Sequence, residues 1–176
     1  MRFAEMQLAG AFVIEAERLE DERGFFARTF DARAFAEREL SVNMLQCSIS
    51  FNKTRGTLRG MHWQDGEDKL IRCTRGAVYD VALDLRRGPT FKRWFSVELS
   101  ADNRKQVYLP RGVAHGFLTL SDDSELFYQM SAEYRADQQH AVRWNDPAFA
   151  IAWPFPPSLI SERDRAHPDF AEGGVP

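Results

Sequence analysis

Two short segments of the chain concentrate side chains that can move protons. The first places Arg59, His62 and Gln64 on a strand-length stretch with two glycines, Arg55-Gly56-Thr57-Leu58-Arg59-Gly60-Met61-His62-Trp63-Gln64. The second brings His115 to the start of a predicted strand, directly after a Pro-Arg-Gly turn. Read as structure alone, Arg59 is a surface charge and each histidine an ordinary hydrogen-bonded side chain. Because loops at strand ends present functional side chains from a rigid scaffold, the two histidines together predict a pocket.

Tyr128 is a third candidate, in the segment Glu125–Gln129. Strand alternation places Leu126 and Tyr128 on one face of this segment. A tyrosine in such a position is more often part of the core than a catalyst. The pattern by itself therefore predicts a core tyrosine.

Metal chemistry is weakly supported by the residues. A metal-binding β-barrel of this kind needs a His-x-His pair and a carboxylate, and the matching stretch, His62-Trp63-Gln64, supplies one imidazole. His62 and His115 are then the remaining candidate ligands, fewer than the usual three or four. Cys47 and Cys73 are the two cysteines, and their spacing fits neither a zinc site nor a disulfide framework. We predict no metal site and no bound cofactor.

Strands must position most of these side chains. Short runs rich in β-branched and aromatic residues, separated by turn residues, fill the middle of the chain and predict an all-β sandwich or barrel. The expected strands are Leu45–Asn52, Lys69–Thr74, Ala77–Leu85, Phe91–Leu99, Gln106–Leu109, Gly116–Leu120 and Glu125–Ser131. In Ala77–Leu85, alternation predicts that the face carrying Tyr79, Val81 and Leu83 is the core side.

The two ends of the chain are expected to differ from this pattern. Asp31 can cap a short, peripheral helix over Ala32–Leu40. The last 23 residues contain five of the eight prolines, which predicts an irregular segment that wraps the domain: Pro154, Pro156, Pro157, Pro168 and Pro176.

Length and charge limit the classes of function. The chain has 176 residues, which fits a single domain over residues 1–176, and its formal net charge is −3. This charge offers no bulk attraction to nucleic acid or to an anionic membrane. No run of about 18 apolar residues and no signal-type apolar core is present, so we expect a cytoplasmic protein.

The ordered blocks of the chain resemble those of the dTDP-4-dehydrorhamnose 3,5-epimerase family, from about Glu20 to Pro168. The similar segments are Asp21–Phe26, Leu58–Gln64, Lys69–Cys73, Pro110–Phe117, Phe127-Tyr128, Trp144–Pro147 and Trp153-Pro154. The resemblance implies a metal-free, cupin-type double-stranded β-helix, or jelly-roll barrel. It also implies epimerisation of a nucleotide-diphosphate 4-keto-6-deoxyhexose at C3, C5 or both, in the biosynthesis of deoxysugars such as dTDP-rhamnose.

The same resemblance assigns roles to the residues that move protons. Epimerisation beside a ketone needs a base, a group that stabilises the enolate, and an acid. His62 occupies the base position of the family, and Asp164 is the carboxylate that would orient its imidazole. Tyr128 matches the acid on the opposite side of the sugar. An imidazole suits the base role because its ordinary pKa of about 6.5 leaves much of it neutral at pH 7.

Further residues are implied to bind the substrate. Lys69 and Arg59 would place positive charge near the enolate or the diphosphate, and His115 maps to the substrate pocket. In the family, the positions of Arg23 and Phe26 belong to the neighbouring subunit of a homodimer and hold the nucleotide, so we expect a dimer with shared sites.

The chain departs from the family pattern where the nucleotide is expected. Arg28 replaces a glutamate, Ser48 replaces an asparagine two residues after the matching Gln46, Gln129 replaces a lysine, and Glu133 replaces one of two tyrosines. These changes leave several alternatives. Arg28 donates to a base other than thymine, pairs with the diphosphate, or is exposed without a ligand role. A barrel that binds a sugar nucleotide without turning it over is the alternative from another functional class.

Overall fold

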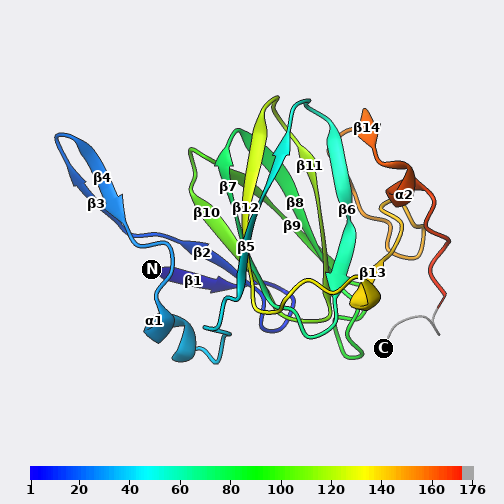
Figure 1. Cartoon of the computed structure of the whole chain (residues 1–176), viewed down its shortest axis with the longest axis horizontal. Helices are drawn as coiled ribbons and strands as arrows, with labels where there is room; N and C mark the ends of the chain where they lie inside the picture. Colours follow the sequence, from blue (N-terminus) through cyan, green and yellow to red (C-terminus); the bar gives the residue numbers. More distant parts are fainter. Residues whose placement is uncertain (172–176) are drawn as a thin grey trace.

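Two six-stranded, mostly antiparallel layers face each other and form a barrel (Figure 1). The computed structural model describes residues 1–171. One sheet has the order β1-β2-β10-β7-β12-β5 and the other β13-β6-β11-β8-β9, with β14 added beside β6. This arrangement is the predicted all-β jelly roll, which the solved structures described below also support.

The strands of the first sheet are β1 (Arg2–Glu5), β2 (Phe12–Glu15), β5 (Gln46–Asn52), β7 (Lys69–Arg75), β10 (Lys105–Leu109) and β12 (Ser124–Met130). Those of the second are β6 (Thr57–Gln64), β8 (Ala77–Asp84), β9 (Trp94–Ser100), β11 (Val113–Thr119), β13 (Gln139–Ala141) and β14 (Leu159–Ile160). The seven strands expected from the sequence are present, with ends shifted by a few residues. β6 corresponds to the strand-length stretch noted around Arg59 and His62. The sequence pattern did not predict β1 to β4, β13 or β14, which are only two to four residues long.

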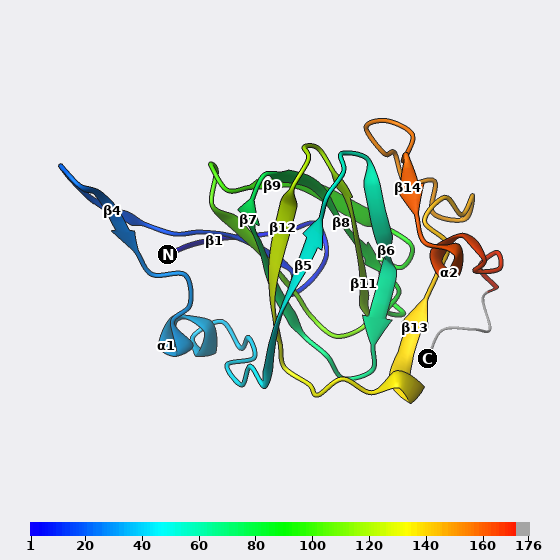
Figure 2. The same cartoon turned by 45° about the horizontal axis from the view of Figure 1, so that its top comes forward.

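Two elements near the N-terminus stand outside the barrel. β3 (Arg18–Asp21) and β4 (Gly24–Ala27) form a hairpin of their own, which projects away from the sheets (Figures 1 and 2). α1 (Ala32–Ala36) follows, and the Asp31 side chain accepts hydrogen bonds from the backbone N–H groups of Arg33 and Ala34. The helix ends before the predicted Leu40 because Glu39 adopts a positive φ of 58° and the Leu40 N–H returns to the Phe35 carbonyl.

Both faces of β8 are buried, so the prediction of one core face was incomplete. Val78 and Ala82 point into the barrel interior, where they pack in the largest apolar cluster. Val81 and Leu83 lie on the opposite face and pack with Phe149 and neighbouring residues of the C-terminal segment. The sequence pattern could not show this, because the segment that covers the second face lies more than 60 positions later in the chain.

The C-terminal segment runs along the outside of the barrel beside β6 (Figure 2). It is mostly irregular, as expected, but two short elements interrupt it. β14 pairs in parallel with β6, and α2 (Glu162–Arg165) follows directly. Through β14, the segment brings α2 to the side of the strand that carries His62.

Strands β6 and β11 approach unusually closely where two glycines meet. A Cβ atom on Gly60 would lie 2.6 Å from the Cα of Gly116, and one on Gly116 would lie 2.5 Å from the Met61 sulfur. Gly60 also has a φ of 144°, which other residues rarely adopt. The two glycines therefore allow β6 and β11 to pair with His62 directly opposite His115.

Candidate active site

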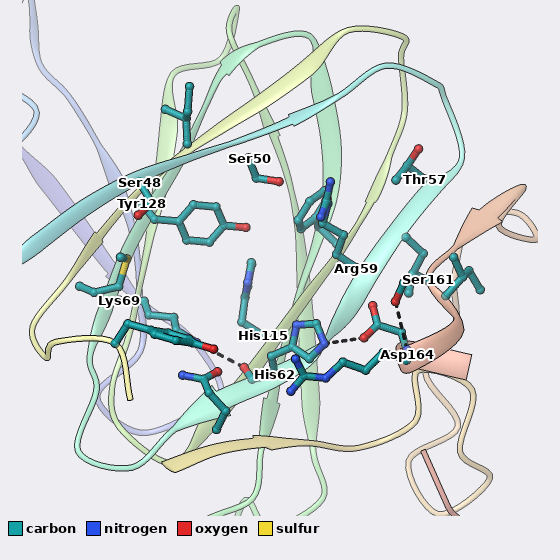
Figure 3. Close-up of a pocket in the computed structure, with 18 of the residues that line it drawn as sticks. Ser48, Ser50, Thr57, Arg59, His62, Lys69, His115, Tyr128, Ser161 and Asp164 are labelled. Atoms are coloured by element: carbon teal, nitrogen blue, oxygen red, sulfur yellow. Dashed lines mark hydrogen bonds and ion pairs between the residues drawn. The ribbon is translucent and has the colours of Figure 1, made fainter. Parts of the chain in front are cut away.

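A cavity of about 670 Å³ is lined by residues from both sheets of the barrel (Figure 3). It is lined by side chains from β5, β6, β7, β11 and β12 and by the segment around β14 and α2. Asp164 lines this cavity. So do six other residues that were predicted to bind or convert the substrate: Ser48, Arg59, His62, Lys69, His115 and Tyr128. Its volume is that of a typical small-molecule site. The predicted pocket around the two histidines is therefore present.

His62 and Asp164 form a hydrogen-bonded pair at the wall of this cavity. The distance between His62 Nε2 and Asp164 Oδ1 is 2.7 Å (Figure 3). The Asp164 side chain is buried, whereas 36% of the His62 side chain is exposed to the cavity side. Because a carboxylate only accepts, Nε2 carries the proton and Nδ1 is left as the basic nitrogen.

The surroundings of Asp164 favour its charged form. Burial by itself would raise the pKa of this carboxyl, but the hydrogen bond and charge of His62 lower it. The backbone N–H of Gly60, 3.4 Å from Oδ2, lowers the pKa further, so that it lies below its ordinary value. The Ser161 hydroxyl caps α2 by accepting from the Asp164 N–H at 3.1 Å. Asp164 is thus held as an anion against the imidazole.

Tyr128 reaches the cavity from β12, on a different wall from His62 (Figure 3). Burial raises the pKa of its phenol, the charge of Asp80 raises it further, and Arg59 opposes this only in part. The phenol therefore keeps its proton and can act as a hydrogen donor. Tyr128 also packs against the main apolar cluster, so the core position expected from its pattern and the cavity position implied by the resemblance both hold.

A second histidine–carboxylate pair lies beside Tyr128. His115 Nε2 is 2.7 Å from Asp80 Oδ2, and both side chains are buried. The rings of His115 and Tyr128 meet edge to face, with centroids 5.8 Å apart. The sequence analysis did not single out Asp80. An available signal was an acidic residue between Val78 and Ala82 on one face of an otherwise apolar strand.

Two cationic side chains of the cavity have partners that the sequence analysis also missed. Lys69 Nζ lies 3.1 Å from Glu67 and donates to the His62 carbonyl at 3.3 Å. Arg59 Nε donates to the Asn52 side chain at 2.8 Å. In both residues the charged group itself makes these contacts, and both side chains line the cavity.

Some of the residues expected at the nucleotide lie away from this cavity in the same chain. Arg23 pairs with Asp21 on the projecting hairpin, and the Phe26 side chain is exposed there. Arg28 makes an ion pair of 2.8 Å with Asp31, the residue that caps α1. Within one chain, then, these three predicted residues do not join the cavity.

Gln46 and Glu133 are not among the residues that line the cavity. The Gln46 side chain accepts a hydrogen bond of 2.9 Å from the backbone of Tyr134, which does line the cavity. Glu133 is exposed, and its backbone carbonyl accepts from the Gln64 side chain at 2.8 Å. Of the two, Gln46 contacts a residue that lines the cavity, Tyr134.

His167 adds a third potential ligand beside the His62–Asp164 pair. One ligand atom from each of these three residues lies within 4.8 Å of the others. The sequence analysis considered only His62 and His115 as metal ligands and missed His167, which follows α2.

No helix among residues 1–171 has the length and apolar character needed to span a membrane.

Comparisons with known proteins agree on one family. Residues 5–172 match the family described as dTDP-4-dehydrorhamnose 3,5-epimerase. The epimerase of that name from Methanothermobacter thermautotrophicus is 41% identical, with 99% of this chain and 97% of the relative covered. The crystal structure of the Elizabethkingia anophelis enzyme superposes with a TM-score of 0.92 at 37% identity, covering 97% and 96% of the two chains. The Legionella pneumophila enzyme, solved with dTDP-4-keto-L-rhamnose, gives 0.88 at 34% identity over 94% and 90%.

Proposed function

The chain belongs to the dTDP-4-dehydrorhamnose 3,5-epimerase family, and we propose that its cavity epimerises a dTDP-linked 4-keto-6-deoxyhexose at C3, C5 or both. The enzyme is an isomerase of deoxysugar biosynthesis. The observation that carries the proposed mechanism is the 2.7 Å contact between His62 and Asp164 at the wall of a cavity that Tyr128 also lines. We take the whole chain as one epimerase domain, and its cytoplasmic location stays a prediction.

His62 removes the proton from the carbon beside the ketone. Its Nδ1 is the free nitrogen, and Asp164 stabilises the imidazolium that forms when Nδ1 takes the proton. The carboxylate also keeps the ring in the tautomer and orientation that the reaction needs. In this step the C–H electron pair moves into the enolate and the proton passes to His62.

The developing negative charge falls on the former ketone oxygen. Lys69 and Arg59 supply positive charge on the cavity wall, and the contacts with Glu67 and Asn52 hold them in place before substrate binds. Such pre-positioned charge stabilises the enolate more than the ketone, and this difference lowers the barrier.

Tyr128 returns a proton to the opposite face of the same carbon. The raised pKa of its half-buried phenol favours the protonated form, and Tyr128 comes from β12 while His62 comes from β6. A base on one side of the sugar and an acid on the other invert the carbon, whereas return of the proton by His62 alone would restore the starting configuration.

We take thymidine diphosphate as the nucleotide. Relatives are described with TDP and with dTDP-4-keto-L-rhamnose bound. Arg28, which replaces a glutamate of the family, pairs with Asp31 of its own chain. Because its charge already has this partner, Arg28 does not require a nucleotide base other than thymine.

A homodimer would complete the site. Leu19 and Phe26 lie opposite each other on the β3–β4 hairpin, and both are mostly exposed. β5 ends its sheet and exposes Ile49 and Phe51. A hairpin of one subunit placed against β5 of the other would cover both apolar surfaces and bring Arg23 and Phe26 to the partner's cavity. Sedimentation analysis should show a dimer that Phe26→Glu weakens, and a monomeric wild type would contradict this arrangement.

Hydrogen exchange tests the reaction directly. With the dTDP-linked keto-sugar in deuterium oxide, the protein should incorporate deuterium at C3 or C5 and form epimerised product. His62→Ala should abolish both while leaving affinity for the substrate close to wild type. His140→Ala, a change outside the cavity lining, serves as the matched control. Binding without exchange at either carbon would favour the non-catalytic alternative.

A further inference from the structure

A half-buried histidine that the proposed mechanism does not use lies beside the base and its carboxylate. His167 follows α2, and one ligand atom of His167 lies within 4.8 Å of ligand atoms from both His62 and Asp164. The Nε2 atom of His167 is buried and has no hydrogen-bond partner among the described residues. A buried imidazole nitrogen without a partner is costly unless something binds it.

We propose that His62, Asp164 and His167 form a binding site for a divalent transition metal, represented by Zn²⁺, and that its occupation switches the epimerase off. Two imidazoles and one carboxylate are a usual protein ligand set for zinc, with a fourth position left for water. The ligand atoms of a tetrahedral site lie about 3.3 Å apart at zinc–ligand distances of about 2.0 Å. His62 and Asp164, now 2.7 Å apart in a hydrogen bond, would separate by about 0.6 Å to admit the metal. His167 would move inward by at most about 1.5 Å from the 4.8 Å limit.

The local charges allow a dication at this position. Asp164 is held as an anion, and its carboxylate is the charged group that attracts a cation to the cluster. Burial lowers the pKa of His167, Asp164 raises it, and His62 and Arg163 lower it, with the net effect downward. In its neutral form His167 offers a nitrogen lone pair to the metal. Arg163 is the opposing charge, and it limits the affinity.

Inhibition follows from which nitrogen of His62 the metal uses. Nε2 faces Asp164, so a metal bound between the two residues displaces the Nε2 proton to solvent. A neutral imidazole bound through Nε2 carries its proton on Nδ1. Nδ1 then has no lone pair for the substrate, and the base is lost without any change in the fold.

Calorimetric titration with ZnSO₄ tests the site without reference to the reaction. The wild type should bind one Zn²⁺ per chain, more weakly as the pH falls because protons compete for the ligands. His167→Gln should weaken binding at least tenfold, since it removes one of three ligands. His140→Gln is the matched control, because His140 is another half-buried histidine with a carboxylate partner, Asp65, at 3.0 Å. It should bind Zn²⁺ like the wild type.

Activity measurements then separate inhibition from binding elsewhere. Zn²⁺ should inhibit the wild type and the His140→Gln variant, and EDTA should restore both. His167→Gln should retain the basal rate and resist the same Zn²⁺ concentration. The proposal is overturned if His167→Gln binds Zn²⁺ as tightly as the wild type does. It is also overturned if the control variant, His140→Gln, no longer binds Zn²⁺. If the keto-sugar is not a substrate, the calorimetric result still decides the metal site, so failure of the proposed function is distinguishable from failure of this inference.

Discussion

His62 and His115 lie directly opposite each other on the paired strands β6 and β11, and each contacts a carboxylate at 2.7 Å. The two pairs differ in exposure. Of the His62 side chain 36% is exposed, whereas only 6% of His115 and 2% of Asp80 are, although His115 also lines the cavity. This difference predicts that the carboxylate of the first pair serves turnover and that of the second pair serves stability and the position of Tyr128.

Asp80→Ala should reduce the free energy of unfolding by about 3 kcal/mol, because it leaves His115 buried without its partner. Guanidinium chloride denaturation measures this change. Glu98→Ala, on the exposed surface of the neighbouring strand β9, should stay within about 0.5 kcal/mol of wild type. Equal effects of the two substitutions would contradict a structural role for the buried pair.

Asp164→Asn should lower turnover by a factor on the order of 10 to 10⁴ and change substrate affinity little. The amide keeps the shape of the side chain but cannot stabilise the imidazolium as a carboxylate does. Steady-state kinetics together with calorimetric binding of substrate separate the two effects. A variant with a near-wild-type rate would mean that Asp164 does not assist the base.

Tyr128→Phe should suppress epimerised product much more than deuterium exchange at the same carbon. His62 still removes the proton, which can return to the face that it left. Mass spectrometry of deuterium uptake and chromatography of the product measure the two quantities in one reaction. Parallel loss of both would count against Tyr128 as the acid.

The contribution of Asp164 to stability should depend on pH in the acid range. Its folded-state pKa is lowered, so the unfolded state binds the proton more readily, and the stabilisation is present above the ordinary pKa of 3.8. It should disappear as the pH falls through the folded-state pKa. The difference in unfolding free energy between wild type and Asp164→Asn, measured from pH 7 downward, should therefore shrink only below about pH 4. If the difference in unfolding free energy is already lost at pH 6, the pH dependence comes from a group other than Asp164.

dTDP should bind more tightly than CDP, GDP or UDP, and Arg28→Glu should leave that order unchanged. The reason is that Arg28 pairs with Asp31, so the substitution affects α1 more than the choice of base. Competition binding with the four diphosphates measures the order. Another diphosphate could instead bind best, with Arg28→Glu restoring the preference for dTDP. That result would mean that Arg28 donates to a base other than thymine, which is one of the alternatives given in the sequence analysis.

The sequence alone determined the strand-rich fold of the central chain, the Asp31 cap and the approach of His62 and His115 to one pocket. These features depend on local alternation, on capping chemistry and on turn residues, which are visible within a few positions. The motif blocks also indicated the family, and through it Asp164, which no local pattern would have paired with a base 102 positions earlier.

Only the tertiary structure decided which groups become partners across the barrel. Asp80 meets His115 because β8 and β11 pair in register, and α2 reaches His62 because β14 adds to β6. Both faces of β8 are buried because a segment distant in sequence covers the outer one. His167 comes close to the His62–Asp164 pair because it follows α2, which β14 brings to the side of β6. Such contacts depend on how distant segments pack, and the side-chain period of a single strand does not contain that information.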